Sequence, residues 1–156
     1  MISVIVPTRD SAIVLPVCLS ALVSAAVSGL VKEVVLADGG SADATLEIAL
    51  DAGARVVAGD VAAAVATAKG DWVLILPPTT RLEAGWEAEA AEHIDRHPGK
   101  AACFRLAFDS ASLGARLREG VSTISAPRPE QGWLVETKRF GQGGLPVRRL
   151  GARAFV

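Results

Sequence analysis

The most constraining feature of this chain is an alternation of strand-like and helix-like segments in its first half. Apolar, largely β-branched runs occupy residues 2–7, 32–38, 54–57 and 71–76, and a segment with helical spacing follows each of the first three. Such alternation predicts a mostly parallel sheet with right-handed crossovers and helices on both faces. We therefore expect an α/β fold.

The second half is less regular. Residues 82–97 are amphipathic and predict a helix, and residues 101–108 predict a strand. A weak helix, a loop and a short strand are expected at 110–119, 121–130 and 132–136, whereas the tail from residue 142 predicts no element. There is no internal repeat or convincing linker, and 156 residues suffice for one core. We expect a single domain over residues 1–156.

Composition excludes several classes of function. Apolar residues make up 51% of the chain and the formal net charge is −1, which is typical of a globular domain and unlike a nucleic-acid-binding protein. The two cysteines, Cys18 and Cys103, lie in apolar surroundings and have neither disulfide nor metal-site spacing. They are expected to be buried thiols in a reduced compartment.

Residues 11–31 carry no charge and are about as long as a membrane span. However, Ser20, Ser24 and Ser28 recur every four residues and place a polar face on the predicted helix. This spacing favours a buried helix of a domain without a transmembrane segment. A signal peptide would have basic residues before its apolar segment, but residues 2–7 predict a strand and contain no Lys or Arg. We expect a cytoplasmic protein, with peripheral membrane attachment left open.

The stretch 37–43, Ala-Asp-Gly-Gly-Ser-Ala-Asp, marks the candidate site. Asp38 stands where a buried strand ends, and ligands in open α/β sheets bind outside the carboxyl ends of the strands. Gly39 and Gly40 allow a close backbone approach, while Ser41 and Asp43 are expected to cap the next helix. A nucleotide-type ligand at Asp38 is the first hypothesis. The alternative is an ordinary tight turn whose amides bind the carboxylate.

The remaining motifs narrow the family. The turn after the first strand, residues 8–11, has no glycine, which excludes a dinucleotide-binding fingerprint, and there is no Walker A pattern. Residues 3–8, the acidic stretch, Gly70-Asp71-Trp72 and Gly85-Trp86 occur instead in that order. This order resembles the family 2 glycosyltransferases with the GT-A fold, in particular a small bacterial subgroup with a D-G-G-S-x-D motif. The resemblance covers about residues 2–94 well, is patchy to about Gly132, and implies a GT-A-like domain shortened at its C-terminus.

The resemblance implies transfer of a sugar from a nucleotide-sugar donor to an acceptor hydroxyl, with inversion; the acceptor stays unknown. A D-Q-G-like stretch carries the family's general base, and here it reads Glu130-Gln131-Gly132. The alternative for Glu130 is an exposed loop residue. The residues expected at the nucleotide or substrate are Thr8, Arg9, Asp10, Asp38, Gly39, Gly40, Thr79 and Arg81. For most of them a turn or helix-start role is the competing interpretation.

The chain departs from the family at the metal motif. The acidic turn expected after the fourth strand reads Pro77-Pro78-Thr79-Thr80, which offers no carboxylate to the Mg²⁺ or Mn²⁺ expected of the family. No metal-binding residue is therefore predicted. Arginines are the candidates to replace the cation at the leaving diphosphate: Arg9, Arg81, Arg128 and Arg139. The alternative is a catalytically degenerate relative that binds a nucleotide or a protein, with homodimer formation left open.

Histidines and tryptophans in the second half have structural interpretations. His93 and His97 have the i, i+4 spacing of a metal pair, but no third ligand is evident and their charged neighbours predict a solvated face. Trp72 and Trp86 are expected in the core. Trp133 could stack on a sugar or pack against the sheet.

Overall fold

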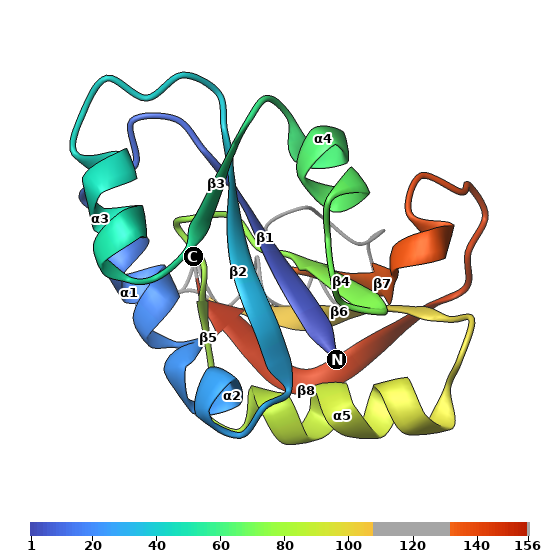
Figure 1. The fold of residues 1–156 in the computed structure, drawn as a ribbon. Coiled ribbons are helices and arrows are strands. Elements are labelled where there is room, and N and C mark those ends of the chain that lie inside the picture. Colours follow the sequence, from blue (N-terminus) through green and yellow to red (C-terminus); the bar gives the residue numbers. More distant parts are fainter. Residues whose placement is uncertain (108–131, 156) are drawn as a thin grey trace.

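Strand β1 (Ile2–Thr8) lies at the centre of a parallel arrangement that forms the first half of the molecule (Figure 1). The computed structural model describes residues 1–107 and 132–155. In it β1 pairs in parallel with β2 (Val31–Asp38) and β4 (Trp72–Ile75), and β2 pairs with β3 (Arg55–Ala58). The register sets Thr8 opposite Asp38, so the carboxyl ends of β1 and β2 are level.

The second half of the chain extends the same sheet. Strand β7 (Trp133–Glu136) runs antiparallel to β4, and β6 (Ala101–Ala107) runs antiparallel to β7. Strand β8 (Val147–Phe155) is parallel to β6, and the short β5 (Arg81–Leu82) pairs with its end. The full order is β3-β2-β1-β4-β7-β6-β8-β5. The predicted α/β class, with a mostly parallel sheet, is confirmed.

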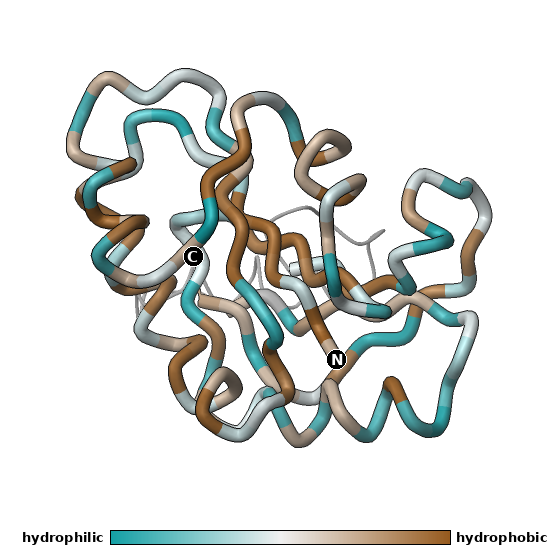
Figure 2. Tube along the Cα trace, in the orientation of Figure 1, coloured by the Kyte–Doolittle hydropathy of each residue, from teal (hydrophilic) through white to brown (hydrophobic). Residues whose placement is uncertain are grey.

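Helices cover both faces of the sheet, as the sequence predicts (Figure 1). On one face of the sheet, Val4 and Val6 of β1 belong to a core cluster with residues of α1 (15–20), α2 (23–27), α3 (45–51) and α5 (86–96). On the other face, Ile5 packs with residues of α4 (61–66). The apolar strands lie inside this layered arrangement (Figure 2). The helices are α1 (Leu15–Ser20), α2 (Val23–Val27), α3 (Thr45–Asp51), α4 (Val61–Ala66) and α5 (Trp86–Arg96), with a 3₁₀ turn at Thr137–Arg139.

The single helix expected within residues 11–31 is wrong, because α1 and α2 are separate. The hydroxyl of Ser20 donates to the carbonyl of Val17 (2.8 Å), a local bond that competes with helix continuation where α1 ends. Leu22 then turns into the core at the junction and is 2% exposed. Of the helices described, none has the length and apolar character needed to cross a membrane.

Two further boundaries differ from expectation. Helix α5 begins at Trp86 rather than Leu82, because Arg81 and Leu82 pair with Phe155 and Ala154 instead. The tail without a predicted element contains β8, whose apolar and charged residues alternate only from Leu150 onward. The predicted helix at 110–119 and loop at 121–130 lie outside the described residues.

The solvated face predicted for His93 is also wrong. His93 is fully buried, and its ring meets Trp72 edge-to-face with centroids 5.7 Å apart. Its Nε2 lies 2.9 Å from the carbonyl oxygen of Lys100, which satisfies one ring nitrogen inside the core. Of the charged residues of α5, Glu92, Asp95 and Arg96 are exposed, whereas the carboxylate of Glu89 accepts from the amide of Gly151 in β8. Trp72 and Trp86 are buried as expected, and so are both free cysteines.

Candidate functional site

The carboxyl ends of the parallel strands frame an open cleft of about 450 Å³. Its walls come from the ends of β1 and β2 and from the turn after β3, which lie side by side through the pairings of these strands. The cleft is lined by Pro7, Thr8, Arg9, Ala37, Gly39, Gly59, Asp60 and Val61. Three of the predicted site residues, Thr8, Arg9 and Gly39, therefore meet at one edge of the sheet.

Asp38 supports this cleft from within its own turn. Its Oδ2 accepts hydrogen bonds from the amides of Gly40 and Ser41, both at 3.0 Å. Its Oδ1 accepts from the hydroxyls of Ser41 (2.5 Å) and Thr8 (3.3 Å). Burial raises the pKa of the carboxyl, but these four donors outweigh it and hold the pKa of Asp38 below its usual range. The ionised carboxylate thus fixes Thr8 and the glycine turn in place.

Asp10 ties the first strand–helix loop to the second. It has a left-handed backbone conformation, φ 48°, and its Oδ1 accepts from the amide of Ala42 at 2.8 Å. In return, the amide of Asp10 donates to Ser41 Oγ (3.0 Å), and the amide of Ala12 donates to Asp43 Oδ2 (3.0 Å). Ser41 is consequently not the helix cap that the sequence suggests: α3 begins after Ala44. The predicted ligand residue Asp10 is engaged in holding two loops together.

The glycines bring the backbone close to the cleft. The amide of Gly39 donates to the carbonyl of Thr8 at 2.8 Å, which closes the floor between β1 and β2. Gly40 has φ 91°, a left-handed conformation that a side chain would strain. Both glycines allow the backbone to turn tightly after β2. The Asp38 carboxylate can therefore accept hydrogen bonds from the amides of Gly40 and Ser41.

Asp60 brings a carboxylate to the cleft that was not among the predicted ligand residues. It caps α4, its Oδ1 accepting from the amide of Ala63 at 2.9 Å, and it also lines the cleft. The sequence does carry a signal for it, because Gly59-Asp60 follows the third strand just as Asp38-Gly39 follows the second. The edge rule for open α/β sheets applies to both positions.

Thr79 and Arg81 follow β4 at this same edge but do not line the cleft. Thr79 is exposed in a turn closed by the amide of Thr80 and the carbonyl of Pro77 (3.0 Å). The guanidinium of Arg81 lies over the ring of Phe155, 4.7 Å from its centroid. In residues 1–107 and 132–155, His, Cys, Asp and Glu nowhere gather in a group of three able to hold a metal ion. The donors present at the turn therefore do not fit Mg²⁺ or Mn²⁺.

The remaining candidates fall elsewhere. Arg139 donates to Glu136 at 3.0 Å, and Glu136 pairs with Trp72 at the start of β4, so this arginine lies at the opposite edge of the sheet. Arg128 and Glu130 lie outside the described residues. Gly132 is described; a Cβ there would approach Leu76 Cδ1 to 3.2 Å, which places it beside the end of β4.

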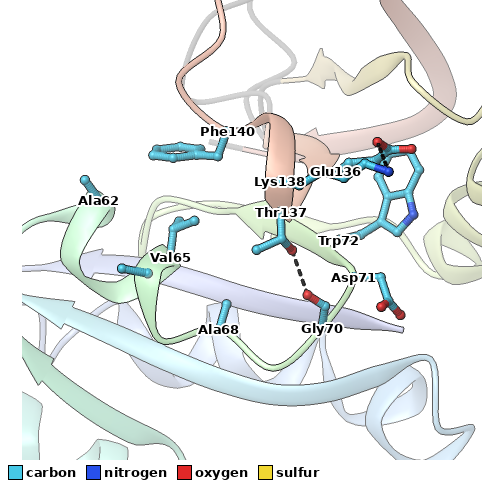
Figure 3. A pocket seen from close by; sticks show the side chains of 11 residues that line it. Ala62, Val65, Ala68, Gly70, Asp71, Trp72, Glu136, Thr137, Lys138 and Phe140 are labelled. Atoms are coloured by element: carbon cyan, nitrogen blue, oxygen red, sulfur yellow. Dashed lines mark hydrogen bonds and ion pairs between the residues drawn. The ribbon is translucent and has the colours of Figure 1, made fainter.

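A larger cavity, about 660 Å³, opens at that opposite edge (Figure 3). Its polar groups largely satisfy one another: Thr137 donates to the carbonyl of Gly70 (2.7 Å), and Lys138 pairs with Glu136 (3.4 Å). Alanines, Val65 and Phe140 form much of the rest of its wall. Since ligands of open α/β sheets bind at the carboxyl edge, the smaller cleft is the candidate site.

Comparisons with known proteins identify the family of the chain. Residues 3–138 match the family model described as glycosyl transferase family 2. A TPR repeat-containing protein of Synechococcus elongatus is 31% identical over 137 residues, which cover 83% of this chain and 32% of the relative.

Solved structures share the fold at low identity. S. aureus TarS in complex with UDP-GlcNAc has a TM-score of 0.67 and 20% identity, over 87% of this chain and 45% of that one. Glucosyl-3-phosphoglycerate synthase from Mycobacterium tuberculosis, in complex with Mn²⁺, UDP and phosphoglyceric acid, has a TM-score of 0.65 and 19% identity, over 88% and 56%. The chain thus spans about half the length of these structures and a third of the curated relative.

Proposed function

Because this chain belongs to glycosyl transferase family 2, we propose that it transfers a sugar from a nucleotide-sugar donor to an acceptor hydroxyl, with the nucleotide in the cleft at the carboxyl edge. Residues 1–156 would act as a single domain. The observation that carries the proposal is the convergence of Thr8, Arg9, Gly39 and Asp60 on one cleft beside the fixed Asp38 turn.

Each cleft residue has a role suited to a nucleotide. The Thr8 hydroxyl and the Asp60 carboxylate would take hydrogen bonds from the base and ribose, and the Arg9 guanidinium would face phosphate oxygens. Asp38, Asp10 and Gly40 would position these groups rather than bind the ligand themselves. This division follows from the hydrogen bonds that Asp38 and Asp10 make inside their own loops.

The transfer would be a single displacement with inversion. The acceptor oxygen attacks the anomeric carbon, the bond from that carbon to the diphosphate oxygen breaks, and Glu130 takes the acceptor proton. The support for Glu130 as the base is the resemblance of Glu130-Gln131-Gly132 to the family's D-Q-G-like stretch. The diphosphate leaves with the electron pair.

Cationic side chains would stabilise the leaving diphosphate in place of a metal. Mn²⁺ is present in the mycobacterial neighbour, but the Pro77–Thr80 turn supplies no carboxylate. Arg9 lines the cleft and fits the role. Arg81 follows this turn and would have to leave the ring of Phe155 to contribute, whereas Arg139 belongs to the other edge. Thr79 would contribute its hydroxyl to a phosphate oxygen.

A second candidate function is a nucleotide-binding module without catalysis. The Pro77–Thr80 turn favours this module, because it carries no carboxylate while the hydrogen-bonded Asp38 loop is present. Turnover separates the two: Glu130→Gln should abolish sugar transfer and leave nucleotide affinity within about twofold if the chain is an enzyme. A wild-type protein that binds a donor but never consumes it would favour the module.

Thermal shift against UDP-, GDP-, ADP- and dTDP-sugars, each with Mn²⁺ and with EDTA, tests the cleft directly, since a ligand that binds only the folded state raises Tm. We expect one nucleotide to stabilise the protein equally in both conditions. A shift that appears only with Mn²⁺ would contradict the metal-free arrangement. No shift with any nucleotide would contradict nucleotide binding itself.

Two substitutions at Asp60 separate ligand binding from helix capping. Serine is a good N-cap, so Asp60→Ser should preserve stability and weaken nucleotide binding about tenfold, whereas Asp60→Ala should lose about 1 kcal/mol of stability as well. Asp71→Asn is the matched control, because Asp71 is an exposed carboxylate at the opposite edge. Unchanged affinity in Asp60→Ser would remove Asp60 from the ligand site.

A further inference from the structure

Three strands in the second half of the sheet bring arginines to its carboxyl edge. β6 runs antiparallel to β7, β7 runs antiparallel to β4, and β8 is parallel to β6. The carboxyl ends of β6 and β8 therefore lie at the same edge as those of β1 and β4. Arg105 and Arg153 stand near these ends, and the 77–80 turn leads from β4 directly into Arg81 of β5.

These three arginines, here called the arginine triad, share one face of the sheet. Arg105 and Arg153 are register partners, and Arg81 is the partner of Phe155, two residues after Arg153. Residues two apart in a strand point to the same face. The core-facing residues of β8 alternate with Arg153 and Phe155: Leu150, Ala152 and Ala154. The triad therefore lies on the face opposite α5.

Phe155 and Glu83 hold two of the guanidinium groups in place. The guanidinium carbons of Arg81 and Arg153 lie over the ring of Phe155, 4.7 and 5.3 Å from its centroid. Glu83 Oε1 accepts from Arg153 Nη2 (2.9 Å), and the amide of Glu83 donates to the carbonyl of Arg153 (2.8 Å). Because a planar guanidinium held in this way loses little further freedom on binding, the triad is preorganised.

The charge of these strands is strongly positive. Residues 81–83, 101–107 and 147–155 contain five arginines and one acidic residue, Glu83. Arg105 is exposed and stands beside Arg153, a juxtaposition of like charges that lowers the stability of a sheet. Local arrangements that oppose stability are expected at functional sites. The juxtaposition of Arg105 and Arg153 therefore points to a negatively charged ligand.

The chemistry of the triad defines the ligand. A guanidinium group matches the paired oxygens of a phosphate or a carboxylate, because its N–H donors form a planar fork. Ligands of open α/β sheets bind at the carboxyl edge, where the triad lies. We propose that Arg81, Arg105 and Arg153 bind a phosphate or carboxylate group of the acceptor, which is therefore an anionic small molecule. This inference rests on the sugar transfer proposed above.

The positions of the cleft and the triad suit two substrates. The nucleotide cleft lies at the ends of β1 and β2, and the triad lies on β6, β8 and β5, with β4 and β7 between them. Helix α1, which follows the loop of Arg9, contacts β5, whose partner is the C-terminal end of β8 (Figure 1). In this arrangement Arg81 serves the acceptor from its place over Phe155, and Arg9 stabilises the leaving diphosphate.

Isothermal titration calorimetry with glycerol 3-phosphate, glycerate and glycerol, at constant ionic strength, tests the triad. All three probes carry hydroxyl groups, and they differ in the phosphate, carboxylate or uncharged group beside them. We expect one or both anions to bind and glycerol not to bind, and the tighter anion identifies the group that the acceptor carries. Binding of none of the three would overturn the proposal, and so would glycerol binding as tightly as the anions.

Substitutions assign the binding to the triad. Arg105→Gln should weaken binding of the tighter anion at least about tenfold, and Arg105→Lys, which keeps the charge without the fork, should restore only part of it. Arg148→Gln is the matched control, because Arg148 is an exposed arginine of β8 whose charge acts on His93 of α5, on the other face. It should bind as wild type does. Equal weakening in Arg105→Gln and Arg148→Gln would indicate general electrostatic attraction and overturn the proposal. Circular dichroism melts confirm that each variant folds.

Nucleotide binding, followed separately by thermal shift, distinguishes failure of this inference from failure of the proposed function. A protein that binds a nucleotide and neither anion refutes the anionic acceptor and leaves sugar transfer standing. A protein that binds an anion through Arg105 and no nucleotide contradicts sugar transfer, and the acceptor role of the triad is then wrong as well.

Discussion

His93 couples folding stability to pH. Burial lowers the pKa of His93, and the nearby charges of His97, Arg148 and Lys100 lower it further against the opposing hydrogen bond to the Lys100 carbonyl. The imidazole is therefore neutral in the fold, while the unfolded chain binds a proton near the ordinary value of 6.5. Stability is complete above that pH and is lost as the pH falls through the lowered folded pKa.

We expect the free energy of unfolding, measured by urea denaturation, to fall from about pH 6.5 toward 5. His93→Gln keeps an amide that can donate to Lys100 and should flatten this slope. His97→Gln, at a less buried ring, should retain the larger part of it. An unchanged slope in His93→Gln would mean that another group titrates in this range.

Gly70 is required by packing. A Cβ at this position would lie 2.5 Å from the amide nitrogen of Ser3 and 2.9 Å from the carbonyl oxygen of Met1, and neither backbone atom can move alone. Gly70→Ala should cost about 2 kcal/mol or more, measured by urea denaturation. Gly143→Ala, which meets nothing within 4 Å, should stay within about 0.5 kcal/mol of wild type. Equal stability of the two variants would contradict this account.

Among single residues, the position of Asp38 at the carboxyl edge was predictable from the sequence, whereas its hydrogen-bond partners were not. A residue that directly follows a predicted parallel strand is expected at the carboxyl edge of the sheet. The sequence alone therefore predicts that Asp38, Gly39 and Thr8 lie close together there. The hydrogen bonds of Asp10 and Ser41 run between two loops 31 residues apart, and no local pattern encodes them. For this reason the loop-to-loop bonds of Asp10 and Ser41 could not be predicted, and the ligand role of Asp10 stays a prediction.

At the scale of elements, Glu33 joins the amino ends of three strands. Its carboxylate accepts from Ser3 Oγ (2.8 Å) in β1, from the amide of Lys69 (2.7 Å) and from Arg55 (3.3 Å) in β3. Burial raises the pKa of Glu33, but these donors and the Arg55 charge hold it below its usual value. The contribution to stability is thus present above the ordinary glutamate pKa and is lost as pH falls through the lowered one.

Glu33→Gln should lower the free energy of unfolding by about 1–3 kcal/mol at pH 7, and the difference should shrink toward acid pH. Urea denaturation at several pH values measures it. The control is Glu92→Gln, because Glu92 forms an exposed i, i+4 pair with Arg96 and should contribute less than about 0.5 kcal/mol. A pH-independent difference would assign the loss to packing rather than to charge.

Elements with strong periodicity were predictable, and those defined by a distant partner were not. β4 is a continuous apolar run, and β1 and β2 each contain a β-branched apolar stretch, so their own composition specifies them. β5 has two residues and is a strand because it pairs with β8. Since Leu82 belongs to this strand, α5 begins later than the helical pattern predicts. Tertiary pairing set these boundaries, against the local helical pattern of residues 82–85.

For the whole molecule, strand order predicts a gradient of local stability. β1 and β4 have neighbours on both sides, whereas β3 and β5 end the sheet. In native-state hydrogen exchange we expect the amides of Val4, Val35 and Leu74 among the slowest and those of Val57 and Leu82 much faster. Slowest exchange at Leu82 would indicate that the second half of the sheet is the stable unit.

The same strand order governs how the chain can fold while it is being synthesised. β3, β2, β1 and β4 all lie within the first 75 residues, so the parallel half with the Asp38 turn can assemble as soon as they leave the ribosome. β5 follows immediately but finds its partner only when residues 154–155 emerge. The cleft that we assign to the nucleotide can therefore form while translation continues, long before the far edge of the sheet closes.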